Sequence, residues 1–215
     1  MATHIVRHGE EPPWRALDDD ERADLFARVT PIDGRCHLGP TTQASACALP
    51  WRPDVPLVRL VDAAWPNPNL VVYYLVTDGE RLLRLNGSSI PIHDANLRCP
   101  IQLSEDNVLD YLRFFCFFTR GEEGAFYLLE RPDHPILDAE LDEPTQAVFE
   151  RVARPAIYTG RNADEHFTCQ AVVFYGDALF DATFEVQANG NVSMLDDDPI
   201  AANLPVRLSA PLGHF

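Results

Sequence analysis

The sequence predicts an α+β fold, in which antiparallel hairpins and a meander form one or two sheets with two or three helices packed on one side. A hairpin signal lies near 70–87, a three-stranded meander is expected near 167–195, and stretches of helical spacing lie before and between them. The 215 residues are enough for one well-buried core. We therefore expect one structural unit, in which a proline-rich, largely irregular segment of residues 1–69 packs on an α+β globular core of residues 70–215.

The N-terminal segment contains one expected helix and a long extended arm. Three aspartates at 18–20 stand at the start of the helix predicted over Asp20–Val29, where carboxylates cap free N–H groups and oppose the helix dipole. The stretch 49–69 contains five prolines, which restrict the backbone and remove hydrogen-bond donors. We expect this stretch to wrap over the surface, with one short strand at Leu57–Val61.

An Asp-Gly pair at 78–79, between two β-rich runs, is a strong hairpin signal. A two-residue turn at this pair places Tyr74 opposite Leu83 and Leu75 opposite Leu82. Both faces of such a hairpin are largely apolar, so we expect it to lie inside a sheet that is partly covered on two sides.

One buried helix is predicted with Ser104 as its N-cap and Gly121 as its stop. The alternative is that 114–119 forms a strand paired with the strand expected at 125–130, and the sequence leaves both readings open. A further helix is predicted from Pro144 to Ala153, because proline is favoured at the first helical position and a second proline follows the last one.

The meander is the clearest pattern in the chain. Two-residue turns at 176–177 and 189–190 leave three antiparallel strands, the third of which places Leu195 opposite Phe184. Between the first two strands this register sets apolar residues against apolar ones on one face and mostly polar residues against each other on the other face. The apolar set is Phe167, Cys169, Ala171 and Val173 against Val186, Phe184, Ala182 and Phe180.

The charge of the chain is strongly negative. It has 33 acidic residues against 17 basic ones, a formal charge of −16, and all 17 are arginines. A surface of this sign repels phosphate backbones and anionic membranes, so we expect neither a nucleic acid nor a membrane as partner. The absence of lysine fits codon bias in a GC-rich genome, and a bacterial source is expected. It also excludes P-loop and Schiff-base chemistry, because both need an ammonium group.

Five cysteines are scattered along the chain without any CxxC spacing. An odd, dispersed set is typical of reduced thiols in a core and not of a disulfide framework or a zinc site. The first thirty residues contain no apolar signal region, and no run approaches the ~18 apolar residues of a membrane span. We therefore expect a cytoplasmic protein.

Three adjacent aspartates at 196–198 follow the third strand of the meander. Such a run can collect Ca²⁺ or Mg²⁺, but a metal site needs oxygens that converge from several directions. In an extended chain only Asp196 and Asp198 share a side. We expect a solvated turn at this run, and neither a metal nor a cofactor in the protein.

The strongest candidate for chemistry is DEHFTC, residues 164–169. A Cys–His nucleophilic pair or a metal site requires Cys169 and His166 to converge. In the predicted register Cys169 faces the core and His166 the opposite side, so no catalytic residue is identified. Arg161, Asp164 and His166 remain as candidate ligand-binding residues at the edge of the sheet; the alternative is the solvent-exposed beginning of a strand.

Two functions follow from these observations. The first is a non-catalytic binding module for a protein or a small-molecule ligand, with cationic partners favoured by the acidic surface. The second is an enzyme, expected to be a hydrolase, whose site is assembled from dispersed carboxylates and histidines such as His37, His93, His134 and His166. Whether the chain forms a homo-oligomer stays open.

Overall fold

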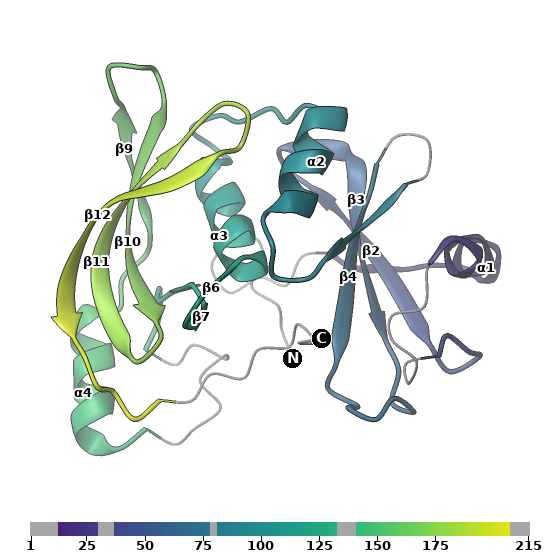
Figure 1. The fold of residues 1–215 in the computed structure, drawn as a ribbon, viewed down its shortest axis with the longest axis horizontal. Helices are drawn as coiled ribbons and strands as arrows, with labels where there is room; N and C mark the ends of the chain where they lie inside the picture. Colours follow the sequence, from purple (N-terminus) through teal and green to yellow (C-terminus); the bar gives the residue numbers. More distant parts are fainter. Residues whose placement is uncertain (1–12, 30–36, 78–80, 133–140, 207–215) are drawn as a thin grey trace. The chain divides into compact units, whose positions relative to one another are not determined.

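The structure is a computed structural model, and it describes residues 13–29, 37–77, 81–132 and 141–206. The described chain divides into two compact units, residues 13–100 and residues 101–206. Each unit contains an antiparallel sheet and two helices (Figure 1). The α+β class is therefore confirmed, and the division falls at residue 100, not at residue 69.

The N-terminal unit is built on a five-stranded sheet whose strands follow one another in chain order, all antiparallel. Residues 13–69, expected to be largely irregular, supply three of these strands and one helix. The strands are β1 (Arg15–Ala16), β2 (Gln43–Leu49), β3 (Arg52–Val61), β4 (Val71–Val76) and β5 (Leu82–Leu85).

The expected surface arm is in fact β3, a central strand. The part of β3 that pairs with strands on both sides, β2 and β4, is Leu57–Val61. This is the range that was predicted as a short strand. Pro53 and Pro56 lie before this doubly paired part, so their missing N–H groups remove no hydrogen bond from it. The prolines therefore set where the double pairing begins and do not prevent the strand.

Two helices accompany this sheet. α1 (Asp19–Arg28) begins one residue before the predicted start, with Asp18 as its N-cap in a capping box with Glu21. It packs one face of the sheet through Leu25, while Leu57 on the other face is also fully buried, which confirms a sheet covered on two sides. α2 (Ile90–Arg98), a helix that was not predicted, contacts β4 and β5.

The hairpin of β4 and β5 exists, but its predicted register was wrong by one residue. Tyr74 lies opposite Arg84 and Leu75 opposite Leu83. The N–H of Thr77 donates to the carbonyl of Arg81 at 2.9 Å, so the loop has three residues where two were predicted. The Asp-Gly pair itself lies outside the described residues.

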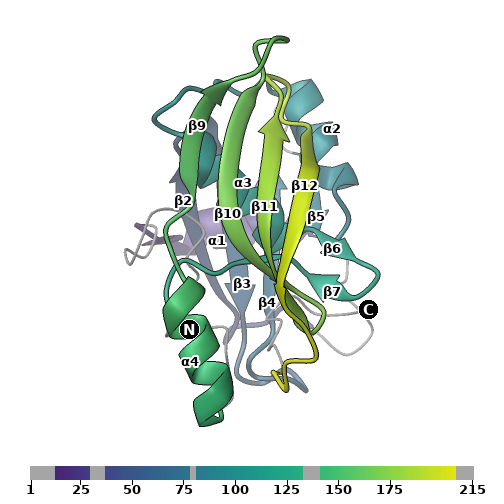
Figure 2. The same cartoon turned by 90° about the vertical axis from the view of Figure 1, so that its left-hand side faces the viewer.

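The C-terminal unit contains a second sheet, which Figure 2 shows face on. The predicted register of its first two long strands is confirmed, with Cys169 opposite Phe184 and Ala171 opposite Ala182. β12 pairs with β11, and both β8 and β9 pair with the far side of β10. The strands are β8 (Tyr127–Leu128), β9 (Ile157–Arg161), β10 (Phe167–Tyr175), β11 (Ala178–Val186) and β12 (Val192–Ala201).

The third strand of the meander differs from the prediction at one position. Met194, and not Leu195, lies opposite Phe184. The reason is the length of the preceding loop. The N–H of Gln187 donates to the carbonyl of Asn191, so the loop has three residues, 188–190, where two were predicted. A β-bulge between the Thr183 and Phe184 pairs then restores the predicted register further along.

Two helices pack on this sheet. α3 (Val108–Phe118) includes 114–118, so this segment is a helix and not a strand; its N-cap is Asn107 and not Ser104. A short hairpin of β6 (Arg120–Gly121) and β7 (Gly124–Ala125) follows it. α4 (Glu143–Val152) matches the predicted third helix within one residue, and its Phe149 packs with Val172 and Phe174.

Candidate functional site

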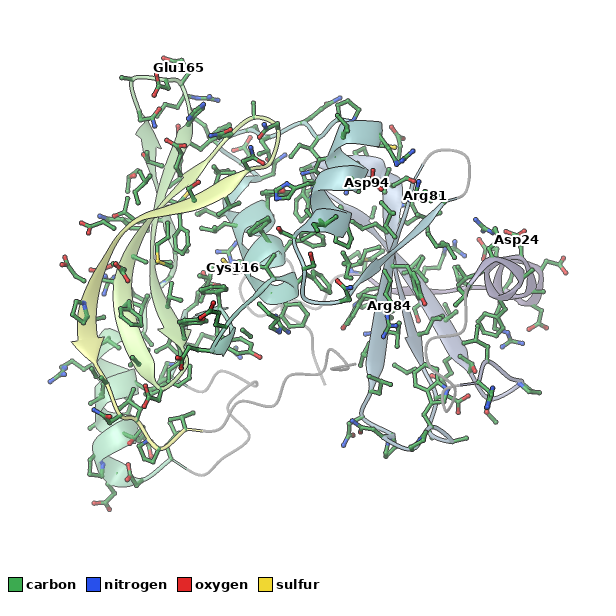
Figure 3. All side chains as sticks on the ribbon, in the orientation of Figure 1. Asp24, Arg81, Arg84, Asp94, Cys116 and Glu165 are labelled. Atoms are coloured by element: carbon green, nitrogen blue, oxygen red, sulfur yellow. The ribbon has the colours of Figure 1, made fainter. Side chains whose placement is uncertain are left out.

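The candidate residues Arg161, Asp164 and His166 lie at the turn between β9 and β10. Asn162 organises this turn, because its Oδ1 accepts hydrogen bonds from the N–H groups of Asp164 and His166, both at 3.0 Å. Glu165 takes a left-handed conformation with φ of 60° at the tip (Figure 3). The site therefore sits on a turn whose shape one asparagine sets.

His166 meets a carboxylate from the neighbouring long strand. Its Nδ1 lies 3.2 Å from Oε1 of Glu185, and Nδ2 of Asn162 donates to Oε2 of Glu185 at 2.6 Å. The amide of Gln187, then the adjacent imidazole of His166 and the amide of Asn162, lower the pKa of Glu185. The carboxylate of Glu185 therefore connects the β9–β10 turn to β11.

The other two candidates do not join this contact. Nη1 of Arg161 donates to the backbone carbonyl of Glu165 at 2.6 Å, and its guanidinium lies 3.9 Å from the ring centre of Phe167. Asp164 is exposed. Of the three predicted residues, only His166 is brought to an ionisable partner.

Sequence reasoning missed Glu185 and Asn162, although a signal for Glu185 existed. The predicted register placed Glu185 opposite Thr168, two residues after His166 on the same side of the strand, and that pairing is confirmed. No periodicity marks Asn162, because its role depends on the turn and not on a strand.

Cys169 takes no part in this chemistry. Its side chain is fully buried on the α3 side of the sheet, and burial raises the pKa of its thiol to about 12, against a smaller lowering by Arg113. Burial raises the pKa of Cys47 and of Cys116 (Figure 3) to about 12 as well. These thiols stay protonated at neutral pH, so none of them is an activated nucleophile.

Three largely buried charged side chains of the C-terminal unit form an ion cluster. Arg113 donates to both carboxylate oxygens of Glu130, at 2.8 and 2.9 Å, and to Asp110 at 2.8 Å, with 11%, 11% and 5% of the three side chains exposed. Glu130 also accepts the N–H of Ala156. Burial alone would lower the pKa of Arg113, but the two carboxylates outweigh it and raise this pKa. These groups join α3 to two loop segments, which is a structural role.

Of the other candidate histidines, His37 and His93 lie in the N-terminal unit. His37 is exposed, and its carbonyl accepts a hydrogen bond from Trp65 Nε1. His93 lies in α2, where partial burial lowers the pKa of its imidazole. His134 lies outside the described residues. Within the described ranges, no group of three or more histidine, cysteine, aspartate or glutamate side chains is arranged to hold a metal ion.

The negative charge is concentrated in one unit. Residues 101–206 contain 20 acidic residues and six arginines, a formal charge of −14, whereas residues 13–100 contain 11 and nine, a formal charge of −2. A field of this strength attracts cations to the C-terminal unit.

The densest part of this charge lies on β12, at the edge of the sheet (Figure 2). The three aspartates at 196–198 are part of this strand, so the expected solvated turn was wrong. Asp196 lies opposite Thr183 and Asp198 opposite Asp181 on one face, while Asp197 lies opposite Ala182 on the other. All three are exposed. Among the residues that the structure describes, none of the three carboxylates forms an ion pair.

The edge contains further exposed groups that sequence reasoning did not select. Met194 and Leu195 are 38% and 55% exposed beside the aspartates. Asp181, which lies opposite Asp198, pairs with Arg154 at 2.6 Å. The edge therefore combines exposed carboxylates and apolar side chains on a strand whose partner among the described strands is β11.

No protein-family model, curated protein or solved structure matches this chain. No helix in the described part of the chain has the length and apolar character needed to cross a membrane. The chemistry open to the C-terminal unit is thus argued from its geometry: a fixed His–carboxylate pair, and an acidic strand edge that can hold cations.

Proposed function

We propose that this chain is a non-catalytic binding protein, whose C-terminal sheet holds a cationic ligand or protein segment at β12. The observation that carries this proposal is the run of three exposed aspartates on an edge strand, without an ion-pair partner in the described chain. Free carboxylates attract cations, and their neighbours on the sheet add to the same field.

The cross-strand pairs support the proposal. Asp198 lies directly opposite Asp181, and like charges in this position destabilise a sheet. Arg154 neutralises Asp181 only. A bound cation would relieve the repulsion that remains. Each exposed pair contributes only about 1 kcal/mol in water, so we expect the ligand to carry several positive charges and to bind more weakly as salt is added.

Titration with an octapeptide of alternating arginine and threonine tests the proposal. We expect saturable binding at low ionic strength by isothermal titration calorimetry. The variant D196N/D197N/D198N should raise the Kd by about tenfold or more, which is ~1.4 kcal/mol.

A matched variant separates a site from a general charge effect. D20N/D54N/E122Q removes the same number of charges at exposed positions outside β12. It should change the Kd by about twofold at most if binding depends on the β12 carboxylates and not on the total charge of the chain. Equal losses in the two variants would contradict a site on β12.

The His166–Glu185 pair favours hydrolysis as a second candidate function. An imidazole whose Nδ1 faces a carboxylate can exchange a proton through Nε2. The nearby thiol of Cys169 is protonated and on the other face, so the attacking group would be water. A nitrophenyl ester assay on the wild type and H166A tests this candidate, and equal rates in both would exclude His166 as the base.

A further inference from the structure

We propose that Arg120, in β6, binds a small monocarboxylate through the Nε and Nη2 edge of its guanidinium. Both nitrogens are buried, and neither has a hydrogen-bond partner in the described chain. Buried polar groups of folded proteins are nearly always hydrogen-bonded, so two adjacent unused donors on one cation indicate an acceptor from outside the chain. This site is separate from β12 and goes beyond the function proposed above.

The third nitrogen of Arg120 has a structural role at the end of α3. Nη1 donates to the carbonyls of Phe117 and Thr119, at 2.6 and 2.9 Å. Arginine side chains commonly satisfy the last carbonyls of a helix in this way. This role holds the guanidinium in place, but it accounts for Nη1 alone and leaves the Nε and Nη2 donors unexplained.

Arg113, in α3, shows which group suits this edge of a guanidinium. Its Nε and Nη2 donate to the two carboxylate oxygens of Glu130, at 2.9 and 2.8 Å. Its Nη1 donates to Asp110 at 2.8 Å. A planar carboxylate matches the two parallel N–H groups of the edge. The Nε and Nη2 edge therefore binds a carboxylate of the chain in Arg113, whereas the same edge of Arg120 meets no acceptor of the described chain.

The electrostatics of Arg120 also favour an anion. Burial lowers the pKa of its guanidinium, and the phenol of Tyr127 opposes this lowering only in part. Among the residues that the structure describes, no carboxylate forms an ion pair with Arg120. A water molecule can accept the two hydrogen bonds but brings no negative charge, and a buried charge without a counter-charge destabilises the fold. An anion supplies both the acceptors and the charge.

The surroundings of Arg120 select the size and the charge of the anion. Both donors are shielded from solvent, which limits the ligand to a small one, while part of the residue reaches the surface, so the edge lies close to solvent. Residues 101–206 have a formal charge of −14, and their field opposes a dianion about twice as strongly as a monoanion. A monocarboxylate is therefore favoured over phosphate or sulfate.

Titration of the full chain with acetate tests the proposal, with the Nε–H signals of the arginines followed in ¹H–¹⁵N spectra. We expect the Arg120 signal to shift saturably, because a carboxylate forms a charge-assisted hydrogen bond with this N–H. The Arg113 signal should stay in place, since Glu130 already occupies that edge. Acetamide, a neutral molecule of similar shape, should shift neither signal. If acetate causes no saturable shift of the Arg120 signal, the proposal is wrong.

Arg120→Lys assigns the signal and tests the bidentate edge. Lysine keeps the charge but lacks the paired donors, so the Kd for acetate, measured through the backbone amide of Gly121, should rise about tenfold or more. Arg151→Lys, at an exposed position of α4, is the control and should leave the Kd unchanged. An unchanged Kd in Arg120→Lys would contradict the site.

Two further results decide the outcome. If Arg120→Lys does not fold, the titration of the unmodified chain decides by itself. Sulfate and phosphate are compared with acetate at equal ionic strength, and shifts of the Arg120 signal as large as those with acetate would overturn the assignment to a carboxylate.

Discussion

The two units contain carboxylates in contrasting settings. In the N-terminal unit Asp24 pairs with Arg28 at 2.6 Å, and Asp94 pairs with Arg98 at 3.0 Å and Arg81 at 3.8 Å (Figure 3). In the C-terminal unit the three aspartates of β12 lie next to one another on the last strand of the described sheet, and no described residue forms an ion pair with them. Paired carboxylates stabilise a fold, whereas unpaired ones at an edge are open to a ligand.

Within the C-terminal unit the same contrast appears between the core and the edge. Glu130 and Asp110 are satisfied by Arg113 in a buried cluster. The β12 carboxylates are exposed, and Asp198 lies opposite another carboxylate, Asp181. Removing charge should therefore have opposite effects on stability at these two places, and the predictions below test this, from the largest effect to the smallest.

Arg113→Ala should have the largest effect. It removes the arginine that pairs with Glu130 and Asp110, whose side chains are only 11% and 5% exposed, so we expect the free energy of unfolding to fall by about 3–5 kcal/mol. Urea denaturation followed by circular dichroism measures the change. Arg151→Ala, at an exposed position of α4, is the control and should stay within about 0.5 kcal/mol of the wild type. If the free energy of unfolding fell equally in both variants, Arg113 would stabilise the fold no more than an exposed arginine does.

Asp62→Ala should have an intermediate effect in the N-terminal unit. The buried carboxylate accepts hydrogen bonds from Thr41, Thr42 and the N–H of Ala64, and its loss should cost about 1–3 kcal/mol. Asp54→Ala, an exposed aspartate of β3, should be nearly neutral.

The same hydrogen bonds predict a pH dependence. The N–H of Ala64, followed by the hydroxyls of Thr42 and Thr41, lowers the pKa of Asp62 in the folded protein. The folded state then binds its proton less readily than the unfolded state. The stabilisation is therefore complete above the ordinary aspartate pKa of about 3.9 and is lost as the pH falls below it. Acid unfolding of Asp62→Ala should lose part of this dependence; an unchanged acid slope would contradict the assignment.

Asp198→Asn should have the smallest effect and the opposite sign. Removing one of two carboxylates that face each other across β11 and β12 should raise the free energy of unfolding by about 0.2–1 kcal/mol at low salt. Asp177→Asn, in the exposed turn before β11, is the matched control and should be neutral. A loss of stability in Asp198→Asn would mean that this carboxylate supports the sheet, which would weaken the case for a ligand site.

Much of the fold could be predicted where the signal is local. Alternation of apolar residues placed Cys169 opposite Phe184, and capping residues placed α1 and α4 within one residue of their observed ends. Where the loop length was the unknown, the prediction failed by one residue, as in the β4–β5 hairpin. Pairing registers depend on loop length, which turn residues indicate only approximately.

The candidate site was less predictable than the fold. His166 and Cys169 were correctly assigned to opposite faces, but Asn162 and Glu185 were missed. The aspartate run on β12 was noticed and then assigned to a turn. A strand at a sheet edge carries little of the apolar alternation that identifies a strand from its sequence, because most of its side chains face solvent.

Taken alone, the sequence determined the fold class, the acidic balance, the lack of lysine chemistry and the facing pairs of the meander. These depend on composition and on neighbours within a few residues, and such neighbours interact in almost any fold. Only the tertiary structure decided that a proline-rich stretch is the central strand β3, that Glu185 receives Asn162 and His166, and that the aspartates lie on an open edge. Those contacts join residues between 10 and 23 positions apart, and no local pattern encodes which strand becomes the neighbour.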